Sequence, residues 1–256
     1  MSTAPKPTII VIPGSFCPRN AYDPIISDLK SHGYPVHGME LETVGKRDKA
    51  PGMYDDAAAV ASLVTGLTDK GKDVVLVAHS YGGLVACEAS KGLAKSAREK
   101  EGKKGGIVRI VFVTAVVPTV GHSVSDITGN AVPVDYVGLE GEYLVITDAS
   151  KCGHISFSDL PPEEAVIWAA KLTPHSAISF AQKLTYAAYK DIPVSYLFCE
   201  DDKLVTPEQQ NKIIAGLESE MGGKTVDRHP VKAGHAVNVS QPKTMVDVVR
   251  KALGHA

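Results

Sequence analysis

Residues 74–86 read Val-Val-Leu-Val-Ala-His-Ser-Tyr-Gly-Gly-Leu-Val-Ala, an apolar run that ends at a serine flanked by small residues. The run Val74–Ala78 predicts a strand, and the residues after Ser80 predict a tight turn into a helix. Such a turn needs small residues two before and two after the serine, because strand and helix approach closely there. Ala78 and Gly82 meet this need, although the usual motif has glycine at both places. The stretch therefore predicts a nucleophile elbow with Ser80 at its tip.

The composition indicates one globular domain with no nucleic acid or membrane partner. The 256 residues carry 27 Lys and Arg against 29 Asp and Glu, a net charge of −2, and no Lys/Arg run exceeds two residues. This pattern lacks the basic footprint that polyanion binding requires. The longest apolar runs have strand length and the first seven residues lack a signal-peptide core, so a cytoplasmic protein is expected. The four cysteines show no metal or disulfide spacing and are expected to be small, buried or half-buried thiols.

Strands and helices are predicted to alternate along most of the chain. Apolar β-branched runs predict strands, and periodic apolar positions predict helices. The predicted strands are Thr8–Ile12, Val36–Leu41, Val74–Ala78, Ile107–Thr114, Val194–Cys199 and Thr225–His229. The predicted helices are Tyr22–Ser31, Tyr54–Leu67, Tyr81–Glu99, Pro207–Leu217 and Pro242–Leu253. This order favours an α/β fold with a mostly parallel sheet and helices on both faces.

The alternation is interrupted between Pro118 and Ile192, where strand signals fade and helical stretches at Glu163–Leu172 and His175–Tyr189 take over. We interpret residues 118–192 as a helical cap inserted into a core formed by residues 1–117 and 193–256. Apolar and aromatic side chains at helical spacing are expected to form the core of this cap rather than to contact substrate: Phe157, Ile167, Trp168, Phe180 and Tyr186.

An elbow serine needs a histidine to take its proton and a carboxylate to orient that histidine. Both partners should follow strands, because loops gather at the carboxyl edge of a parallel sheet. His235 follows the last predicted strand and precedes the last helix, whereas His229 lies at the end of that strand and is the weaker candidate. The order serine, acid, histidine is the one found in α/β-hydrolases.

The acid is expected directly after the strand Val194–Cys199, where Glu200, Asp201 and Asp202 stand in a row. Asp202 is preferred because it begins the turn that leads to the helix at Pro207, and Asp201 is the alternative. The remaining carboxylates are expected to be solvated near the N-terminus of that helix, where negative charge is favourable.

Acyl transfer also needs N–H donors aimed at the developing oxyanion. The amide of Tyr81, directly after the nucleophile, is the first expected donor. The second should come from the loop after the first strand, where Gly14 gives the backbone freedom to turn an amide inward. Ser15 is the expected donor there, and Phe16 is the alternative.

No metal or other cofactor is expected. His79 beside the nucleophile and His122, His154 and His175 in or near the cap invite a metal hypothesis. None of them occurs in an HxH, HExxH or Cys/His spacing, and a serine triad needs no metal.

Four motifs together resemble the α/β-hydrolase superfamily over nearly the whole chain: Val11-Ile12-Pro13-Gly14-Ser15-Phe16, Ala78-His79-Ser80-Tyr81-Gly82-Gly83, Cys199-Glu200-Asp201-Asp202, and Gly234-His235 with Ser240-Gln241-Pro242. The loop after Pro13 is similar to the branch of plant methyl-ester esterases, hydroxynitrile lyases and pyrethroid-type esterases. Within the insertion, residues 159–165 and 185–193 resemble small fungal and bacterial hydrolases of unassigned substrate. Hydroxynitrile lyases typically carry a threonine in the oxyanion loop and a lysine after the catalytic histidine, where this chain has Gly14 and Ala236.

The motifs and the resemblance together imply a serine hydrolase, an esterase or lactonase, that acts on a small to medium, mainly apolar carboxylic ester or lactone. Catalytic roles are expected for Ser80, Asp202 and His235, with Ser15 and Tyr81 forming the oxyanion hole. Two alternatives remain open: a non-catalytic ligand-binding module on the same fold, and a C–C lyase or acyltransferase that uses the same triad. The expected partner is the small-molecule substrate, and a homodimer is left open.

Overall fold

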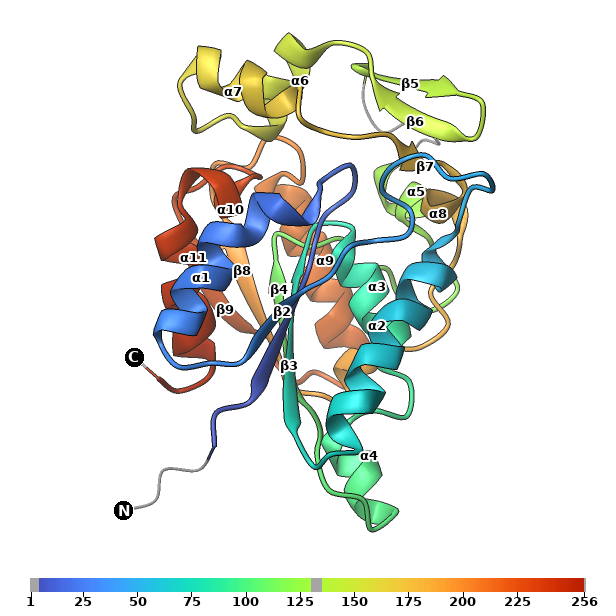
Figure 1. The fold of residues 1–256 in the computed structure, drawn as a ribbon, viewed down its shortest axis with the longest axis vertical. Helices are drawn as coiled ribbons and strands as arrows, with labels where there is room; N and C mark the ends of the chain where they lie inside the picture. The colour runs from blue at the N-terminus through green and yellow to red at the C-terminus, as the bar shows by residue number, and fades with distance from the viewer. Residues whose placement is uncertain (1–4, 130–134, 256) are drawn as a thin grey trace.

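The computed structural model describes residues 5–129 and 135–255, which build a six-stranded sheet between two layers of helices (Figure 1). The strand order is β2-β1-β3-β4-β8-β9, and all neighbouring strands run parallel. The strands are β1 (Thr8–Ile12), β2 (Val36–Gly38), β3 (Asp73–His79), β4 (Gly106–Val113), β8 (Val194–Cys199) and β9 (Asp227–Val231). The mostly parallel sheet predicted from the sequence is thereby confirmed.

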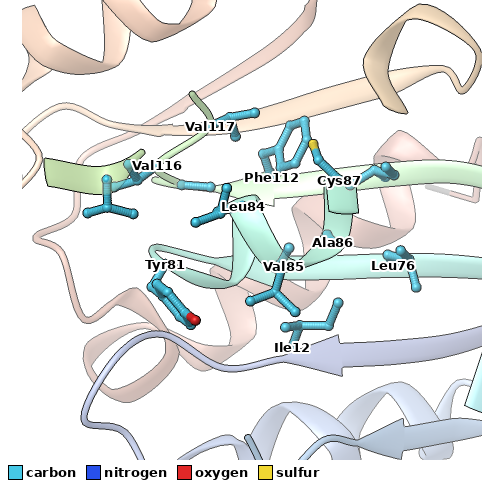
Figure 2. Close-up of a cluster of buried hydrophobic side chains, with 14 of the residues drawn as sticks. Ile12, Leu76, Tyr81, Leu84, Val85, Ala86, Cys87, Phe112, Val116 and Val117 are labelled. Carbon is cyan, nitrogen blue, oxygen red and sulfur yellow. The ribbon is translucent and has the colours of Figure 1, made fainter. Parts of the chain in front are cut away.

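Two hydrophobic layers cover the sheet because successive side chains of a strand point to opposite faces. Ile9 and Val11 of β1 belong to one buried cluster, which includes apolar residues of α1 (Asp23–Ser31) and α11 (Pro242–Ala252). Ile10 and Ile12 belong to the other cluster, with α2 (Met53–Thr68), α3 (Gly82–Ala89) and α9 (Pro207–Glu220). Figure 2 shows part of this second cluster, where Ile12 of β1, Leu76 of β3 and Phe112 of β4 surround the side chains of α3.

Three short elements accompany the longer helices of the core. These are η1 (Arg19–Tyr22), α4 (Lys95–Lys100) and α10 (Val237–Ser240). The helix expected over Tyr81–Glu99 is broken: α3 ends at Ala89, and Gly92 follows with a left-handed φ of 74°. A residue with positive φ cannot continue a right-handed helix, so the chain turns and begins α4 three residues later.

Most of the insertion lies above the carboxyl edge of the sheet, at the top of Figure 1, and its last residues lead down to the start of β8. It contains α5 (Val124–Thr128), α6 (Ala149–Ser156), α7 (Pro162–Ala169), α8 (Ile178–Ala181) and η2 (Ala188–Lys190). It also contains an antiparallel sheet of β5 (Val137–Glu140), β6 (Tyr143–Ile146) and β7 (His175–Ser176). Helices were expected here, whereas this sheet was not.

The helix predicted over His175–Tyr189 is wrong. His175 and Ser176 pair with Leu144 and Tyr143 of β6, and only α8 within this stretch is α-helical. A two-residue strand has no period that a sequence pattern could reveal, and its pairing with β6 overrides the local helical preference.

Several other expectations concern exposure and the ends of the chain. Cys87, Cys152 and Cys199 are buried free thiols and Cys17 is a half-buried one, as expected. Ile167 is 57% exposed and does not belong to a cap core. No helix among the described residues is long and apolar enough to cross a membrane. Residues 1–4, on which the expectation about a signal peptide partly rests, and residues 130–134 of the insertion lie outside the described residues.

Candidate active site

Ser80 lies at the tip of the turn between β3 and α3, with a left-handed φ of 52°. For a non-glycine residue this conformation is uncommon and marks a strained position. The turn is so tight that a Cβ on Gly82 would lie 2.6 Å from the carbonyl oxygen of Pro13 and 2.8 Å from that of Ile12. The small residue required two positions after the serine is therefore explained by the approach of α3 to the end of β1.

Three of the predicted site residues come together at this point. The Ser80 hydroxyl lies 3.0 Å from Nε2 of His235, and Nδ1 of His235 lies 2.8 Å from Oδ2 of Asp202. Asp202 follows β8 and His235 follows β9, so both reach the serine from the carboxyl ends of neighbouring strands. All three side chains are buried. The arrangement can pass a proton from the serine to the imidazole while the carboxylate fixes the ring.

The competing candidates lie elsewhere. Glu200 and Asp201 are exposed, and their backbone amides donate to backbone carbonyl oxygens. The carboxylate that contacts His235 belongs to Asp202. His229 contacts the carboxylate of Asp227 at 2.9 Å, on its own strand. The structure thus brings Asp202, and not its neighbours, to the imidazole.

The Asp202 carboxylate is surrounded by donors. Oδ1 accepts the amides of Leu204 at 2.8 Å and Val205 at 2.9 Å, and Oδ2 accepts the Thr114 hydroxyl as well as the His235 ring. Burial favours the neutral acid, but attraction to His235 when that ring is protonated, together with the hydrogen bonds from His235, Thr114 and Leu204, holds the pKa of Asp202 below its ordinary value. The carboxylate is therefore kept ionised beside the imidazole.

Thr114 was not recognised as a site residue from the sequence. It follows β4 with a positive φ of 35° and its hydroxyl faces Asp202 across the sheet edge. The available signal was its place at the end of the predicted strand Ile107–Thr114, since the carboxyl ends of parallel strands meet at one edge.

The loop after β1 lies against the nucleophile. A Cβ on Gly14 would lie 3.1 Å from Cβ of Ser80, a tight contact that a larger residue could make only if its neighbours shifted. Within the described residues, the amides of Ser15 and Tyr81 donate to no protein group. The amide of Phe16, the alternative donor, donates instead to Nδ1 of His175 at 3.4 Å.

A cavity of about 780 Å³ opens over Ser80, His235, Ser15 and Tyr81. Its remaining walls are mostly apolar and come from both the core and the insertion, including Val116, Val124, Val137, Ile146, Phe157, Trp168, Leu172, Phe180, Leu204, Val205 and Val239. Phe157, Trp168 and Phe180 were expected to form cap core only, but they pack within the cap and also line this cavity. A volume of this size accommodates a small to medium organic ligand.

The histidines considered as metal ligands are dispersed. His79 and His175 are buried in separate hydrogen-bond networks, and His122 contacts the Thr119 hydroxyl at 3.1 Å. Among the described residues no group of three or more His, Cys, Asp or Glu side chains is arranged to hold a metal ion.

Comparison with known proteins gives one family and two curated relatives. The model of the family described as "Alpha/beta hydrolase family" matches residues 9–248. "Probable hydrolase R7" of Phoma sp. is 36% identical over 97% of this chain and 99% of its own length. "Alpha/beta hydrolase nvfD" of Aspergillus novofumigatus is 29% identical over 98% of both chains.

Solved structures share the fold at lower identity. A pyrethroid hydrolase from Sphingobium faniae JZ-2 superposes with a TM-score of 0.72 at 19% identity and covers 96% of both chains. An extracellular α/β-hydrolase from a Paenibacillus species gives 0.71 at 21% identity, covering 96% of this chain and 99% of that one. Polyneuridine aldehyde esterase gives 0.71 at 19% identity, covering 97% and 98%. The likeness extends over the insertion as well as the sheet.

Proposed function

The chain belongs to the alpha/beta hydrolase family, and from this premise we propose that it is a serine hydrolase that forms an acyl-enzyme on Ser80. Its proposed substrates are small to medium, mainly apolar carboxylic esters or lactones. The proposal is supported above all by the continuous hydrogen-bond path from Ser80 through His235 to Asp202, at 3.0 Å and 2.8 Å, on the wall of an apolar cavity.

In the acylation step, Ser80 Oγ attacks the substrate carbonyl while His235 Nε2 takes the hydroxyl proton. Asp202 accepts the Nδ1–H of His235, fixes its tautomer and stabilises the imidazolium that forms. The carbonyl oxygen becomes an oxyanion, which the amides of Ser15 and Tyr81 are proposed to bind. His235 then gives its proton to the leaving alkoxide, and the alcohol departs.

Deacylation repeats the same steps with water as the nucleophile. His235 takes a proton from water, hydroxide adds to the acyl carbon, and the Ser80 oxygen leaves with the proton that His235 returns. The released product is the carboxylic acid. With a lactone, the acid and the alcohol leave as one molecule, because the leaving alkoxide stays attached to the acyl group.

The substrate class is supported by the cavity walls and by the names of similar proteins. Apolar side chains surround most of the space over Ser80, so burial of an apolar acyl or alcohol group is the main source of binding there. Among the similar structures are a pyrethroid hydrolase and an esterase. Ala236 follows His235 where hydroxynitrile lyases typically have lysine, which favours hydrolysis over cyanohydrin cleavage.

The first test is replacement of the nucleophile. Ser80→Ala should reduce hydrolysis of p-nitrophenyl acetate by about 10⁴-fold or more, because attack by oxygen on an acyl carbon is then lost. Ser90→Ala is the control: Ser90 is buried at the end of α3 and donates only to Ala86 O at 2.6 Å. Full activity in Ser80→Ala would refute the assignment.

Labelling and product analysis separate this proposal from its alternatives. A fluorophosphonate probe should label the wild-type protein and not Ser80→Ala, whereas a ligand-binding module with an inactive serine would remain unlabelled. Mass analysis of products from a panel of esters, lactones and thioesters should give free acids. An acylated acceptor alcohol or a cleaved C–C bond would indicate an acyltransferase or a lyase.

A further inference from the structure

We call the loop after β1, residues 13–16, the oxyanion loop, and hydrogen bonds hold it on both sides of Ser15. The Gly14 amide donates to the Tyr22 hydroxyl at 3.0 Å, and the Phe16 amide donates to Nδ1 of His175 at 3.4 Å. The acceptors come from different parts of the fold, since Tyr22 belongs to η1 in the core and His175 belongs to β7 in the insertion. Between these two engaged amides lies that of Ser15.

The tautomer of His79 follows from the chemistry of its partners. Its Nε2 lies 3.0 Å from the carbonyl oxygen of His235, which can only accept, so Nε2 carries the proton. Its Nδ1 is then an acceptor and receives the Tyr22 hydroxyl proton at 2.6 Å. The Tyr22 oxygen in turn accepts the Gly14 amide. One directed chain therefore runs from the oxyanion loop through Tyr22 and His79 to the backbone of His235.

The tautomer of His175 follows in the same way. The Phe16 amide can only donate, so Nδ1 of His175 is unprotonated and Nε2 carries the proton. Nε2 donates to the Ser179 hydroxyl at 3.0 Å, and that hydroxyl donates to Ser176 O at 2.7 Å. The imidazole is also enclosed by aromatic rings, with centroids of Phe16, Tyr81 and Phe180 within 5.3 Å. Its orientation is thus fixed by hydrogen bonds at both nitrogens and by packing.

Both hydrogen-bond networks require a neutral imidazole, because a protonated Nδ1 would donate a hydrogen bond and could not accept one. Burial lowers the pKa of His175 to about 3, and burial together with repulsion from His235, when that ring is protonated, lowers the pKa of His79 to about 3. The two rings are neutral at any pH near 7. Neutrality also matters for catalysis, since the ring of His79 lies 5.0 Å from that of His235, where a second positive charge would oppose the imidazolium formed during acylation.

We propose that Tyr22 with His79, and His175 from the insertion, are positioning residues that hold the amides flanking Ser15 and so aim the Ser15 N–H at the oxyanion. The assignment rests on the proposed serine hydrolase function. It explains why Phe16 keeps a positive φ of 61° without being glycine, because its amide and its ring are both fixed by His175. It also selects Ser15 over Phe16 as the oxyanion donor, since the Phe16 amide is already engaged.

The test uses variants that release one side of the loop at a time. Tyr22→Phe removes the acceptor of the Gly14 amide, and His175→Leu removes that of the Phe16 amide. His175→Asn is the conservative rescue, because an asparagine Oδ1 can occupy the place of Nδ1. Tyr34→Phe is the matched control: its hydroxyl contacts Nδ1 of His255 at 2.5 Å, a second tyrosine–histidine pair near the C-terminus and away from the cavity.

Two quantities are measured for each variant with p-nitrophenyl acetate as substrate: kcat with KM, and the affinity of a trifluoromethyl ketone that forms an oxyanion adduct with the serine. Tyr22→Phe and His175→Leu should each lower kcat about tenfold or more with KM within about twofold, since loss of an oxyanion donor costs about 10²–10³ in kcat. Affinity for the ketone should fall in parallel. His175→Asn should recover most of the loss, and Tyr34→Phe should behave as wild type.

The outcomes separate this inference from the proposed function. Folded Tyr22→Phe and His175→Leu proteins with unchanged kcat and ketone affinity would overturn the inference, even if their Tm fell. His175→Asn performing no better than His175→Leu would overturn the part assigned to His175. Failure of the proposed function would appear differently, as a wild-type protein that fluorophosphonate does not label. If either Tyr22→Phe or His175→Leu does not fold, the kinetics of the other variant still test the inference.

Discussion

Thr114 is the residue whose contribution is best isolated, because it touches the triad through a single hydroxyl. That hydroxyl donates to Oδ2 of Asp202, the same oxygen that accepts the His235 ring. Thr114→Val preserves the shape and removes the donor, so the Asp202 carboxylate loses one of its stabilising bonds. We expect kcat/KM to fall about tenfold, as for the loss of one hydrogen bond to a charged group. Thr119→Val, which removes a hydroxyl that contacts His122 on the exposed surface, is the control and should leave kcat/KM unchanged.

Asp56 is a buried carboxyl beneath the residue that follows the nucleophile. It accepts the Tyr81 hydroxyl at 2.9 Å and the amide and hydroxyl of Thr43 at 3.1 Å and 2.7 Å. Burial raises the pKa of Asp56 to about 6, against the opposing effect of these hydrogen bonds. Because the folded pKa lies above the ordinary 3.8, the folded protein binds this proton more tightly than the unfolded chain. The stability it contributes is complete below pH 3.8 and is lost as the pH rises through about 6.

Asp56→Asn should remove this pH dependence. The free energy of unfolding of the wild type minus that of the variant is expected to fall by about 2 kcal/mol between about pH 4 and about pH 7. Urea unfolding of both proteins across this range measures the difference. Asp48→Asn, at an exposed position, is the control and should give a constant difference. A constant difference for Asp56→Asn as well would contradict the prediction.

Among the elements, the end of α6 and the loop that carries His235 are joined on both sides of the histidine. The amide of Ala236 donates to Ser156 O at 3.1 Å, and that of Gly234 donates to the Asp159 carboxylate at 2.9 Å. The contact is close, because a Cβ on Gly234 would lie 2.7 Å from Oδ1 of Asp159. The insertion therefore helps to place the imidazole although it supplies no triad residue.

Asp159→Ala should loosen this loop and lower kcat about fivefold with little change in KM, because one of the hydrogen bonds beside His235 is lost. Asp159→Asn keeps an acceptor and should recover part of the loss. Asp55→Ala is the control, because the Asp55 carboxylate also accepts a backbone amide, that of Gly52 at 2.7 Å, but at the start of α2 and not beside His235. Steady-state kinetics with p-nitrophenyl acetate decide, and equal kcat in all three variants would contradict the coupling.

The elements of the core were predictable because their signals are local, whereas those of the insertion were not. The buried strand before Ser80 and the helix after it were predicted directly from apolar residues and glycines, and so were the positions along the chain of the other parallel strands. The sheet of the insertion depends on β7, which has two residues, and on pairings that tertiary contacts select.

The same distinction holds for the candidate site. Ser80, Asp202 and His235 each follow a predicted strand, so topology alone indicated that they would meet. Tyr22, Thr114 and His175 were not predicted, because no sequence motif marks the side-chain hydrogen bonds that they make. Their roles depend on which groups the folded chain places within hydrogen-bond distance.

At the scale of the whole molecule, the core supplies Ser80 and His235 to the cavity, and the insertion supplies much of its apolar wall. Val239 of α10 lines this space, whereas Val166 of α7 is 37% exposed and does not line it. Val239→Phe should lower kcat/KM for esters of long or branched acids about tenfold relative to p-nitrophenyl acetate, because the added ring occupies binding volume. Val166→Phe is the same substitution outside the cavity and should leave the ratio unchanged. If both variants gave the same ratio of kcat/KM for these esters to kcat/KM for p-nitrophenyl acetate, the substrate would not bind against Val239.

The insertion contacts the loops around Ser80, and these contacts limit how the insertion can be exchanged between related proteins. Grafting a foreign insertion to change substrate range would carry away His175, which holds the Phe16 amide, and Asp159, which holds the Gly234 amide. A chimera that exchanges residues 118–192 without these two side chains should fold around an intact sheet and yet turn over slowly. A chimera that keeps His175 and Asp159 should gain new cavity walls while Ser80 and His235 keep their positions.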